Sequence, residues 1–233
     1  MFRPAWELAT EYGNVWLGEI IRIAERFGHT VLDLSRDAAT QERLFTALAE
    51  FQPDIMFLCS HGNESQFSGQ NGEIVFTACH NDEIMAGNQA YYLSCLMGEA
   101  LVPSMVSKGA VTVAGYVTEF VWVIDPAYVD DKLADPRAYP FMRAIVESSG
   151  RLLEGGSWQH FYDTWVAMCN MGVREWFERD DPTAPSIVAA LEQDRDSLVV
   201  LGETSIRPVQ EALARAMSPL PPALGVTLLA LFL

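Results

Sequence analysis

Residues 54–60 read Asp-Ile-Met-Phe-Leu-Cys-Ser and form a nearly continuous apolar run. Such a run is typical of a central parallel strand that is covered on both faces, because neither set of alternating side chains meets water. Residues 90–94 (Ala-Tyr-Tyr-Leu-Ser) and 110–116 (Ala-Val-Thr-Val-Ala-Gly-Tyr) have the same character. A helical stretch over 98–108 separates them, with Pro103 tolerated in its first turn. The order strand, helix, strand predicts an α/β fold with a mostly parallel sheet flanked by helices.

Flanking segments complete this α/β pattern. Apolar residues at helical spacing predict further helices, and short apolar runs bounded by turn residues predict further strands. The expected helices cover 16–27, 40–51, 137–153, 158–177 and 207–217, and the expected strands cover 30–34, 74–78 and 197–201. No stretch has the composition of a flexible linker, so we expect one domain over residues 1–217, followed by an apolar C-terminal tail over 218–233.

The apolar tail is too short to cross a bilayer as a helix. Residues 223–233 would extend about 16 Å at the helical rise, against about 30 Å of hydrocarbon. We therefore expect a buried terminal strand or helix, with membrane contact as the less favoured alternative. The first residues contain no apolar signal-peptide core, so we expect a cytoplasmic protein.

Composition restricts the classes of partner and cofactor. The chain has 233 residues, 50% of them hydrophobic, with 15 Lys and Arg against 31 Asp and Glu, which gives a formal net charge of −16. Such a chain repels polyphosphate, so we do not expect it to bind nucleic acid. None of the four Cys residues lies in a Cys-x-x-Cys pair, so we expect free thiols in a reducing compartment and no zinc site. No phosphate-binding glycine loop is present, and we expect no cofactor.

Two reactive side chains follow the predicted buried strands. His61 comes directly after residues 54–60, and Cys95 comes directly after residues 90–94. Because ligands bind at the carboxyl ends of parallel strands, both residues face one site if the two strands are neighbours. A thiol needs a base to become a nucleophile, so Cys95 and His61 predict a catalytic dyad, helped by the start of the helix after Cys95. The N–H groups of Gly62 and Cys95 are candidate donors to an oxyanion.

These motifs also resemble a known family. His-Gly after an apolar strand (57–62), a small residue before Cys after the next strand (92–98) and a strand that starts Gly-Ala (109–116) are similar to the caspase–gingipain superfamily of cysteine peptidases, in its gingipain-like and CHAT-like branches. The resemblance spans roughly residues 30–116. It implies a caspase-like three-layer fold. It also implies hydrolysis of a protein or peptide substrate through an acyl-enzyme on Cys95, with His61 as general acid and base and no metal.

Two departures from that family are visible. Residues 1–10 do not offer the apolar first strand that such proteins carry before their first helix. The Gln-Ala-Cys signature of animal caspases is absent, because residues 93–96 read Leu-Ser-Cys-Leu. Cleavage after Asp is therefore not implied.

Many members of the family place a carboxylate in the substrate pocket and cleave after a basic residue. By position, the candidates here are Glu119 and Asp125, just past residues 110–116, and Asp82 and Glu83, in the loop before the predicted nucleophile. A carboxylate in the pocket would pair with Arg or Lys of the substrate.

Two other functions remain open from the sequence. One is a non-enzymatic domain of the same fold that binds a partner protein and leaves the dyad unused. The other is a flavodoxin-like domain that binds a small molecule, for which residues 28–34 (Gly-His-Thr-Val-Leu-Asp-Leu) and the strand-helix-strand order are suitable. Cys79 and His80 are also adjacent, but neighbouring residues on a strand point to opposite faces, so we expect neither a dyad nor a metal site there.

Overall fold

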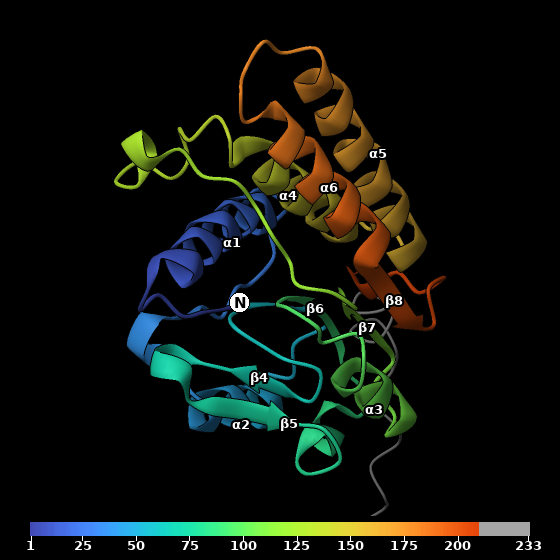
Figure 1. Cartoon of the computed structure of the whole chain (residues 1–233). Coiled ribbons are helices and arrows are strands. Elements are labelled where there is room, and N and C mark those ends of the chain that lie inside the picture. Colours follow the sequence, from blue (N-terminus) through green and yellow to red (C-terminus); the bar gives the residue numbers. More distant parts are fainter. Residues whose placement is uncertain (210–233) are drawn as a thin grey trace, which may run out of the picture.

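A six-stranded sheet forms the centre of the computed structural model, which describes residues 1–209 (Figure 1). The strands lie in the order β2-β1-β3-β6-β7-β8. All neighbours run parallel except β8, which pairs antiparallel with β7. Their bounds are Phe2–Arg3 (β1), Leu34–Ser35 (β2), Met56–Cys59 (β3), Gln89–Leu93 (β6), Thr112–Tyr116 (β7) and Leu198–Gly202 (β8). The prediction of an α/β fold with a mostly parallel sheet is confirmed.

Helices cover both faces of this sheet, which makes three layers (Figure 1). On one face lie α1 (Leu8–Arg26), α4 (Tyr139–Leu153), α5 (Trp158–Phe177) and α6 (Ala184–Ser197). On the other lie α2 (Gln41–Glu50), α3 (Leu101–Ser107) and a hairpin of β4 (Gln66–Ser68) and β5 (Ile74–Thr77). Short 3-10 turns link these elements at Arg36–Ala38 (η1), Gln70–Gly72 (η2), Asp82–Met85 (η3) and Pro126–Tyr128 (η4).

The central strands supply side chains to two hydrophobic cores. All four residues of β3 are buried. Phe57 and Cys59 pack toward α1, α4, α5 and α6, whereas Met56 and Leu58 pack toward α2, α3 and the hairpin. Because successive side chains on a strand point to opposite faces, a strand covered on both sides needs apolar residues at every position. This explains the unbroken apolar run at residues 54–60.

Helix α1 approaches the sheet closely beside the carboxyl end of β3. Its N-terminus is capped by Glu7, whose carboxylate accepts the N–H groups of Ala9 and Thr10, while the Thr10 hydroxyl accepts the N–H of Glu7. Gly13 permits the close approach, because a Cβ at this position would lie 3.0 Å from Cys59 Sγ. The buried apolar face of the helix recurs at helical spacing and comprises Tyr12, Trp16, Leu17, Ile20 and Ala24.

The N-terminal edge of the sheet differs from the sequence-based prediction. The strand expected over 30–34 is wrong, since only Leu34–Ser35 pair with a neighbour. Residues 1–10 do contain a first strand, β1, which lies between β2 and β3. Leu34 donates its N–H to the Met1 carbonyl at 2.9 Å. Strands of two residues have no alternation to detect, which is why the sequence pattern does not reveal them.

Elsewhere the predicted elements agree more closely. Helix α5 has the predicted bounds of 158–177, and Pro103 lies in the first turn of α3. Helix α6 was not predicted. Residues 210–217 of the last predicted helix and the whole apolar tail (218–233) lie outside the described residues. Within residues 1–209, no helix is both long and apolar enough to cross a membrane.

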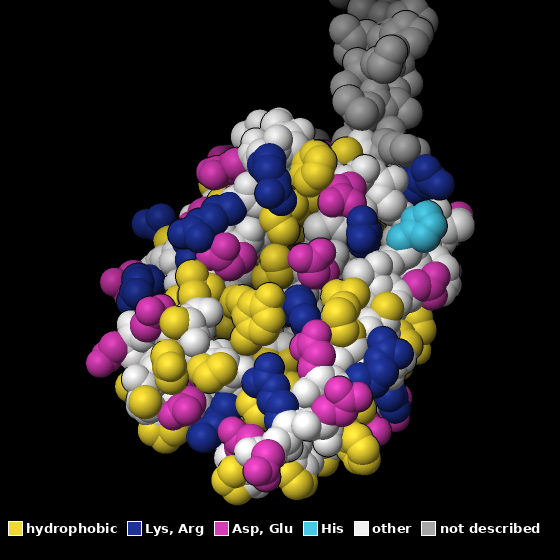
Figure 2. Space-filling model, turned by 90° about the horizontal axis from the view of Figure 1, so that it is seen from above, with side chains coloured by type: hydrophobic (Ala, Val, Ile, Leu, Met, Phe, Trp, Pro, Cys, Tyr) yellow, Lys and Arg dark blue, Asp and Glu magenta, His cyan; other side chains and the backbone are white. Residues whose placement is uncertain are grey.

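The charged surface is mixed on the face seen from above in Figure 2. Basic and acidic side chains are interspersed there, with hydrophobic side chains between them. Ion pairs of the helical layer include Arg143 with Glu175 and Arg195 with Asp196, at 2.9 and 2.7 Å. The net charge of −16 therefore does not form one continuous acidic surface on this face.

Candidate active site

The carboxyl ends of β3 and β6 bring His61 and Cys95 into one region. The strands are neighbours, and Cys59 pairs in register with Leu93, so the loops that carry the two residues leave the sheet side by side. Gly62 lies against the second loop, because a Cβ on it would meet the Ser94 hydroxyl and would lie 3.1 Å from the Cys95 carbonyl oxygen. His61 and Cys95 line the same cavity. Both residues therefore lie at the carboxyl ends of neighbouring strands, as expected, and their roles stay a prediction.

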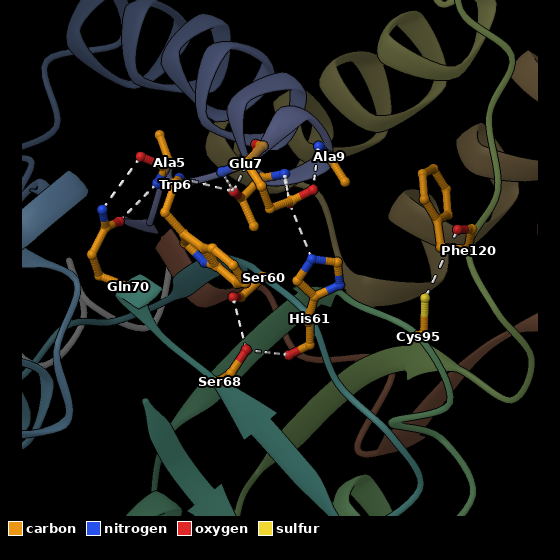
Figure 3. Close-up of polar contacts among 11 residues, drawn as sticks. Ala5, Trp6, Glu7, Ala9, Ser60, His61, Ser68, Gln70, Cys95 and Phe120 are labelled. Carbon is orange, nitrogen blue, oxygen red and sulfur yellow. Dashed lines mark hydrogen bonds and ion pairs between the residues drawn. The ribbon is translucent and has the colours of Figure 1, made fainter. Parts of the chain in front are cut away.

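Glu7 holds the imidazole of His61. Its Oε1 lies 3.0 Å from Nε2 of His61 and also accepts the N–H of Thr10 at 2.7 Å (Figure 3). Burial tends to raise the pKa of Glu7, but the N–H groups of Thr10 and Ala9 and the His61 ring outweigh it, so the pKa lies below its ordinary value. An ionised carboxylate accepts only, so Nε2 carries the proton and Nδ1 of a neutral ring is left as the base.

Other contacts fix the orientation of His61. Its carbonyl oxygen accepts from both the backbone N–H and the hydroxyl of Ser68, at 3.0 and 2.9 Å, which ties the loop to the hairpin (Figure 3). The Trp6 ring lies edge-on to the imidazole with centroids 5.8 Å apart. No hydrogen bond to Nδ1 of His61 is formed within residues 1–209. The ring is therefore held from one side and left free at the nitrogen that would exchange a proton.

Sequence reasoning missed Glu7. The spacing of Glu7 and Thr10 is compatible with the start of a helix, but it carries no information about a contact with a residue 54 positions later. The packing of α1 on the sheet creates that contact. The contact between Glu7 and His61 could be predicted only if it were known which helix covers the end of β3.

The Cys95 side chain is half-buried and contacts a backbone carbonyl. Its Sγ donates to the carbonyl oxygen of Phe120 at 3.9 Å (Figure 3). Burial raises the pKa of Cys95, and the carboxylate of Glu119 acts in the same direction. The expected help from a helix start is wrong, because α3 begins at Leu101 and the helix dipole acts mainly over the first turn.

Two backbone donors lie beside these side chains. The N–H groups of Gly62 and Cys95 have no acceptor within the described part of the chain. Both belong to the two loops that meet at the cavity. Cys95 lines the cavity and Gly62 does not, so an oxyanion site built from both N–H groups stays a prediction.

A cavity of about 240 Å³ opens between α1 and the two strand ends. Its lining residues are Ala9, Thr10, Gly13, Trp16, Cys59, Ser60, His61, Leu93, Ser94, Cys95, Phe120 and Trp122. The rings of Trp16 and Trp122 meet edge to face with centroids 5.5 Å apart, and those of Phe120 and Trp122 lie 5.8 Å apart. The cavity beside the thiol is thus walled mainly by aromatic and small apolar groups.

The carboxylates proposed after β7 lie outside this cavity wall. Glu119 is exposed and immediately precedes Phe120, which lines the cavity. Asp125 caps η4 by accepting the N–H of Ala127 and pairs with Arg137 at 3.6 Å. Neither carboxylate is among the groups that line the cavity.

Asp82 and Glu83 lie at the other edge of the sheet. They belong to η3, which precedes the first residue of β6, whereas Cys95 follows its last residue. Asp82 is fully buried and pairs with Lys108 at 2.6 Å, and Glu83 pairs with the same amine at 3.2 Å. Burial acts to raise the pKa of Asp82, but the Lys108 ammonium outweighs it and the pKa is lowered. These two carboxylates neutralise Lys108, and the structure does not bring them to the candidate site.

The remaining sequence candidates lie apart from the dyad. Cys79 has a positive φ of 62° and lies in an exposed turn, not in a strand, with its N–H donating to Ser104. No group of three or more potential metal ligands occurs within residues 1–209. Most of residues 28–34 line a second cavity of about 600 Å³ together with Asp54 and Met56, at the amino edge of β3. The flavodoxin-like alternative expects its ligand at the opposite, carboxyl edge.

Comparison with protein-family models, with curated proteins and with solved structures finds no match for this chain.

Proposed function

We propose that this protein is a cysteine peptidase in which Cys95 is the nucleophile, His61 the general acid and base, and Glu7 the residue that positions His61. The observation that carries the proposal is that His61 and Cys95 line one cavity while Glu7 binds Nε2 of the imidazole. A nucleophile, a base and a group that orients the base are the components that thiol catalysis needs. The neighbouring positions of β3 and β6 also support the resemblance to the caspase–gingipain superfamily.

The reaction follows from the roles of these groups. As the substrate carbonyl reaches Sγ, the thiol proton passes to Nδ1 of His61 and the sulfur forms a bond to the carbonyl carbon. The carbonyl oxygen becomes an oxyanion that accepts from the N–H groups of Gly62 and Cys95. Collapse of this intermediate breaks the C–N bond, and His61 gives its proton to the leaving amine. His61 then takes a proton from water, and the water oxygen forms a bond to the thioester carbon. The C–S bond breaks to release the carboxylic acid, and His61 returns the proton to sulfur.

The proposal includes a compartment and a substrate class. All four Cys residues are free thiols, a state that a reducing compartment such as the cytoplasm maintains. The substrate is a protein or peptide, because its amide supplies the carbonyl and the leaving amine. The acidic net charge argues against nucleic acid as a partner.

A second function is favoured by one observation at the same site. The pKa of Cys95 is raised by burial, and its S–H points at the Phe120 carbonyl. A thiol held in this way is a poor nucleophile unless substrate displaces it from that contact. A domain that binds a partner protein at this cavity without cleaving it would have the same geometry.

Hydrolysis of a peptide library, read by mass spectrometry, distinguishes the two. Wild type and Cys79→Ala should cleave the library, while Cys95→Ala and His61→Ala should not. Cys79 is the matched control because it is an exposed thiol away from the cavity. Cleavage that survives in Cys95→Ala contradicts the proposed peptidase. A folded wild type that cleaves nothing favours the binding domain.

A further inference from the structure

We infer that the substrate residue whose carbonyl reacts with Cys95 has an apolar side chain, of the Leu, Met or Phe kind, which occupies the cavity between α1 and the two strand ends. This inference rests on the proposed function, and it replaces the expectation of cleavage after a basic residue. It follows from three properties of the cavity: its walls, a lining that contains no carboxylate among the described residues, and its size.

The walls of the cavity are mainly carbon surface, with the indole N–H groups of Trp16 and Trp122 buried without a partner within residues 1–209. Trp16 is fully buried and Leu93 is nearly so, and Phe120 and Trp122 pack against each other on the side of the β7–α4 connection. Thr10 is engaged in the α1 capping box. A bound alkyl or aromatic group would therefore meet carbon surface, whose removal from water favours binding.

None of the polar groups in the lining is a carboxylate. The Ser60 hydroxyl lies 3.1 Å from the Ser68 hydroxyl, and the Ser94 hydroxyl is buried and neutral. Glu7 is the nearest carboxylate to His61, and its oxygens accept from His61 and from two backbone N–H groups of α1. Glu7 itself is not among the lining residues of the cavity.

The carboxylates on the opposite side do not reach into the cavity either. Asp194 is fully buried behind the wall, where its Oδ1 accepts the N–H of Val121 at 3.0 Å, and it does not line the cavity. Asp125 is paired with Arg137, and Glu119 is exposed outside the lining. An Arg or Lys side chain in the cavity would lose its hydration without gaining a counter-ion, which is strongly unfavourable.

The size of the cavity suits one side chain. Its volume of about 240 Å³ is below the lower end, about 300 Å³, of pockets that enclose whole drug-sized ligands. Small residues on α1, Ala9 and Gly13, create the space opposite the strand ends. Because the cavity includes Cys95 in its lining, a side chain bound there lies next to the reacting carbonyl.

A panel of acyloxymethyl ketones tests the inference on the full chain. The probes share one leaving group and one peptide and differ only in the residue next to the ketone: Leu, Phe, Arg or Asp. The measurement is the second-order rate of Cys95 modification, by intact mass and peptide mapping. We expect the Leu or Phe probe to react at least about tenfold faster than the Arg and Asp probes, a ratio typical of side-chain discrimination in apolar pockets.

The outcomes separate the inference from the proposed function. If the Arg or Asp probe is as fast as the apolar probes, the inference is wrong while the peptidase stands. If no probe modifies Cys95 in either the wild type or His61→Ala, the proposed function fails and the inference fails with it.

A paired substitution checks that this cavity sets the preference. Ala9→Leu adds bulk to the cavity from a half-exposed helical position. It should slow the Leu probe about tenfold and narrow the ratio between the Leu and Arg probes. Ala49→Leu is the control, since Ala49 is exposed on α2 at the other face of the sheet. A folded Ala9→Leu protein with wild-type selectivity overturns the assignment of this cavity.

Discussion

The close approach of the two loops at the candidate site can be tested without any assumption about catalysis. A Cβ on Gly62 would meet the Ser94 hydroxyl, and it would lie 3.0 Å from the Gln66 carbonyl oxygen and 3.1 Å from that of Cys95. Gly62 has no positive φ, so alanine is allowed by the backbone at this position. Any loss of stability in Gly62→Ala must therefore come from these contacts. The two to Ser94 and Cys95 join the His61 loop to the Cys95 loop, and the third is to β4.

Two opposing contributions set the size of this stability loss: overpacking in the folded state and restriction of the unfolded chain. Overpacking of a tight site costs about 1–3 kcal/mol, and the upper end applies here because two of the three contacts involve backbone oxygens that cannot rotate away. Replacing glycine restricts the unfolded chain and returns about 0.4–1 kcal/mol. We expect Gly62→Ala to lower the free energy of unfolding by about 2 kcal/mol. Ser94→Ala should change it by less than about 1 kcal/mol, because the hydroxyl is buried without a hydrogen-bond partner within residues 1–209.

The double mutant isolates the contact. With the Ser94 hydroxyl gone, the methyl group at position 62 meets one fewer atom, so the double mutant should be more stable than the sum of the single effects by about 1 kcal/mol. Urea unfolding followed by tryptophan fluorescence measures each value at constant m. Ser149→Ala is the control partner, since its hydroxyl is also buried and unpartnered but lies on α4. If the changes in the free energy of unfolding at positions 62 and 94 add within about 0.5 kcal/mol, the contact is refuted, and the shared site with it.

Three further changes have defined outcomes. Glu7→Ala should lower the free energy of unfolding by about 1–2 kcal/mol through loss of the α1 cap. Glu7→Gln should lose less stability but slow hydrolysis at least about tenfold, because an amide does not stabilise protonated His61. Equal rates of hydrolysis for Glu7→Gln and wild type would remove Glu7 from the mechanism. Lys108→Met leaves the Asp82 carboxylate buried without its cation and should lower the free energy of unfolding in urea by about 3 kcal/mol at pH 7. This difference from wild type should become smaller as acid protonates Asp82, and a difference that does not change with pH would contradict the prediction. Burial raises the pKa of Asp194 far above its ordinary value, so its carboxyl loses its proton at lower pH in the unfolded state than in the fold. The free energy of unfolding of wild type should therefore fall by up to about 1.4 kcal/mol per pH unit above pH 4. Asp194→Asn should remove this slope, and an unchanged slope would show that the carboxyl is ionised in the fold.

The central strands could be predicted because burial on both faces leaves a direct trace in the sequence. β3, β6 and β7 coincide closely with the apolar runs at 54–60, 90–94 and 110–116. The short strands β1 and β2 could not be predicted, since two-residue pairings depend on the neighbouring strand and have no periodicity of their own. The same limit applies to the start of α3, which begins three residues after the predicted start at Gly98.

The candidate site divides in the same way. His61, Gly62 and Cys95 could be located from the sequence, because the carboxyl ends of parallel strands meet at one edge of a sheet. The carboxylates could not be placed, since a position near a strand end does not show whether a cation elsewhere neutralises the group. Asp82 is the clear case: its partner, Lys108, follows it by 26 positions and holds it at the opposite edge.

By itself, the sequence determined the α/β class, the three buried parallel strands and the two reactive residues that follow the first two of them. Only the tertiary structure decided that Glu7 reaches His61, that burial raises the pKa of Cys95, and that the adjoining cavity has mainly apolar walls. The physical reason is that periodicity and runs of apolar residues report which faces of an element are buried. They do not report which helix or loop covers those faces, and the cover supplies the positioning carboxylate and the walls of the cavity.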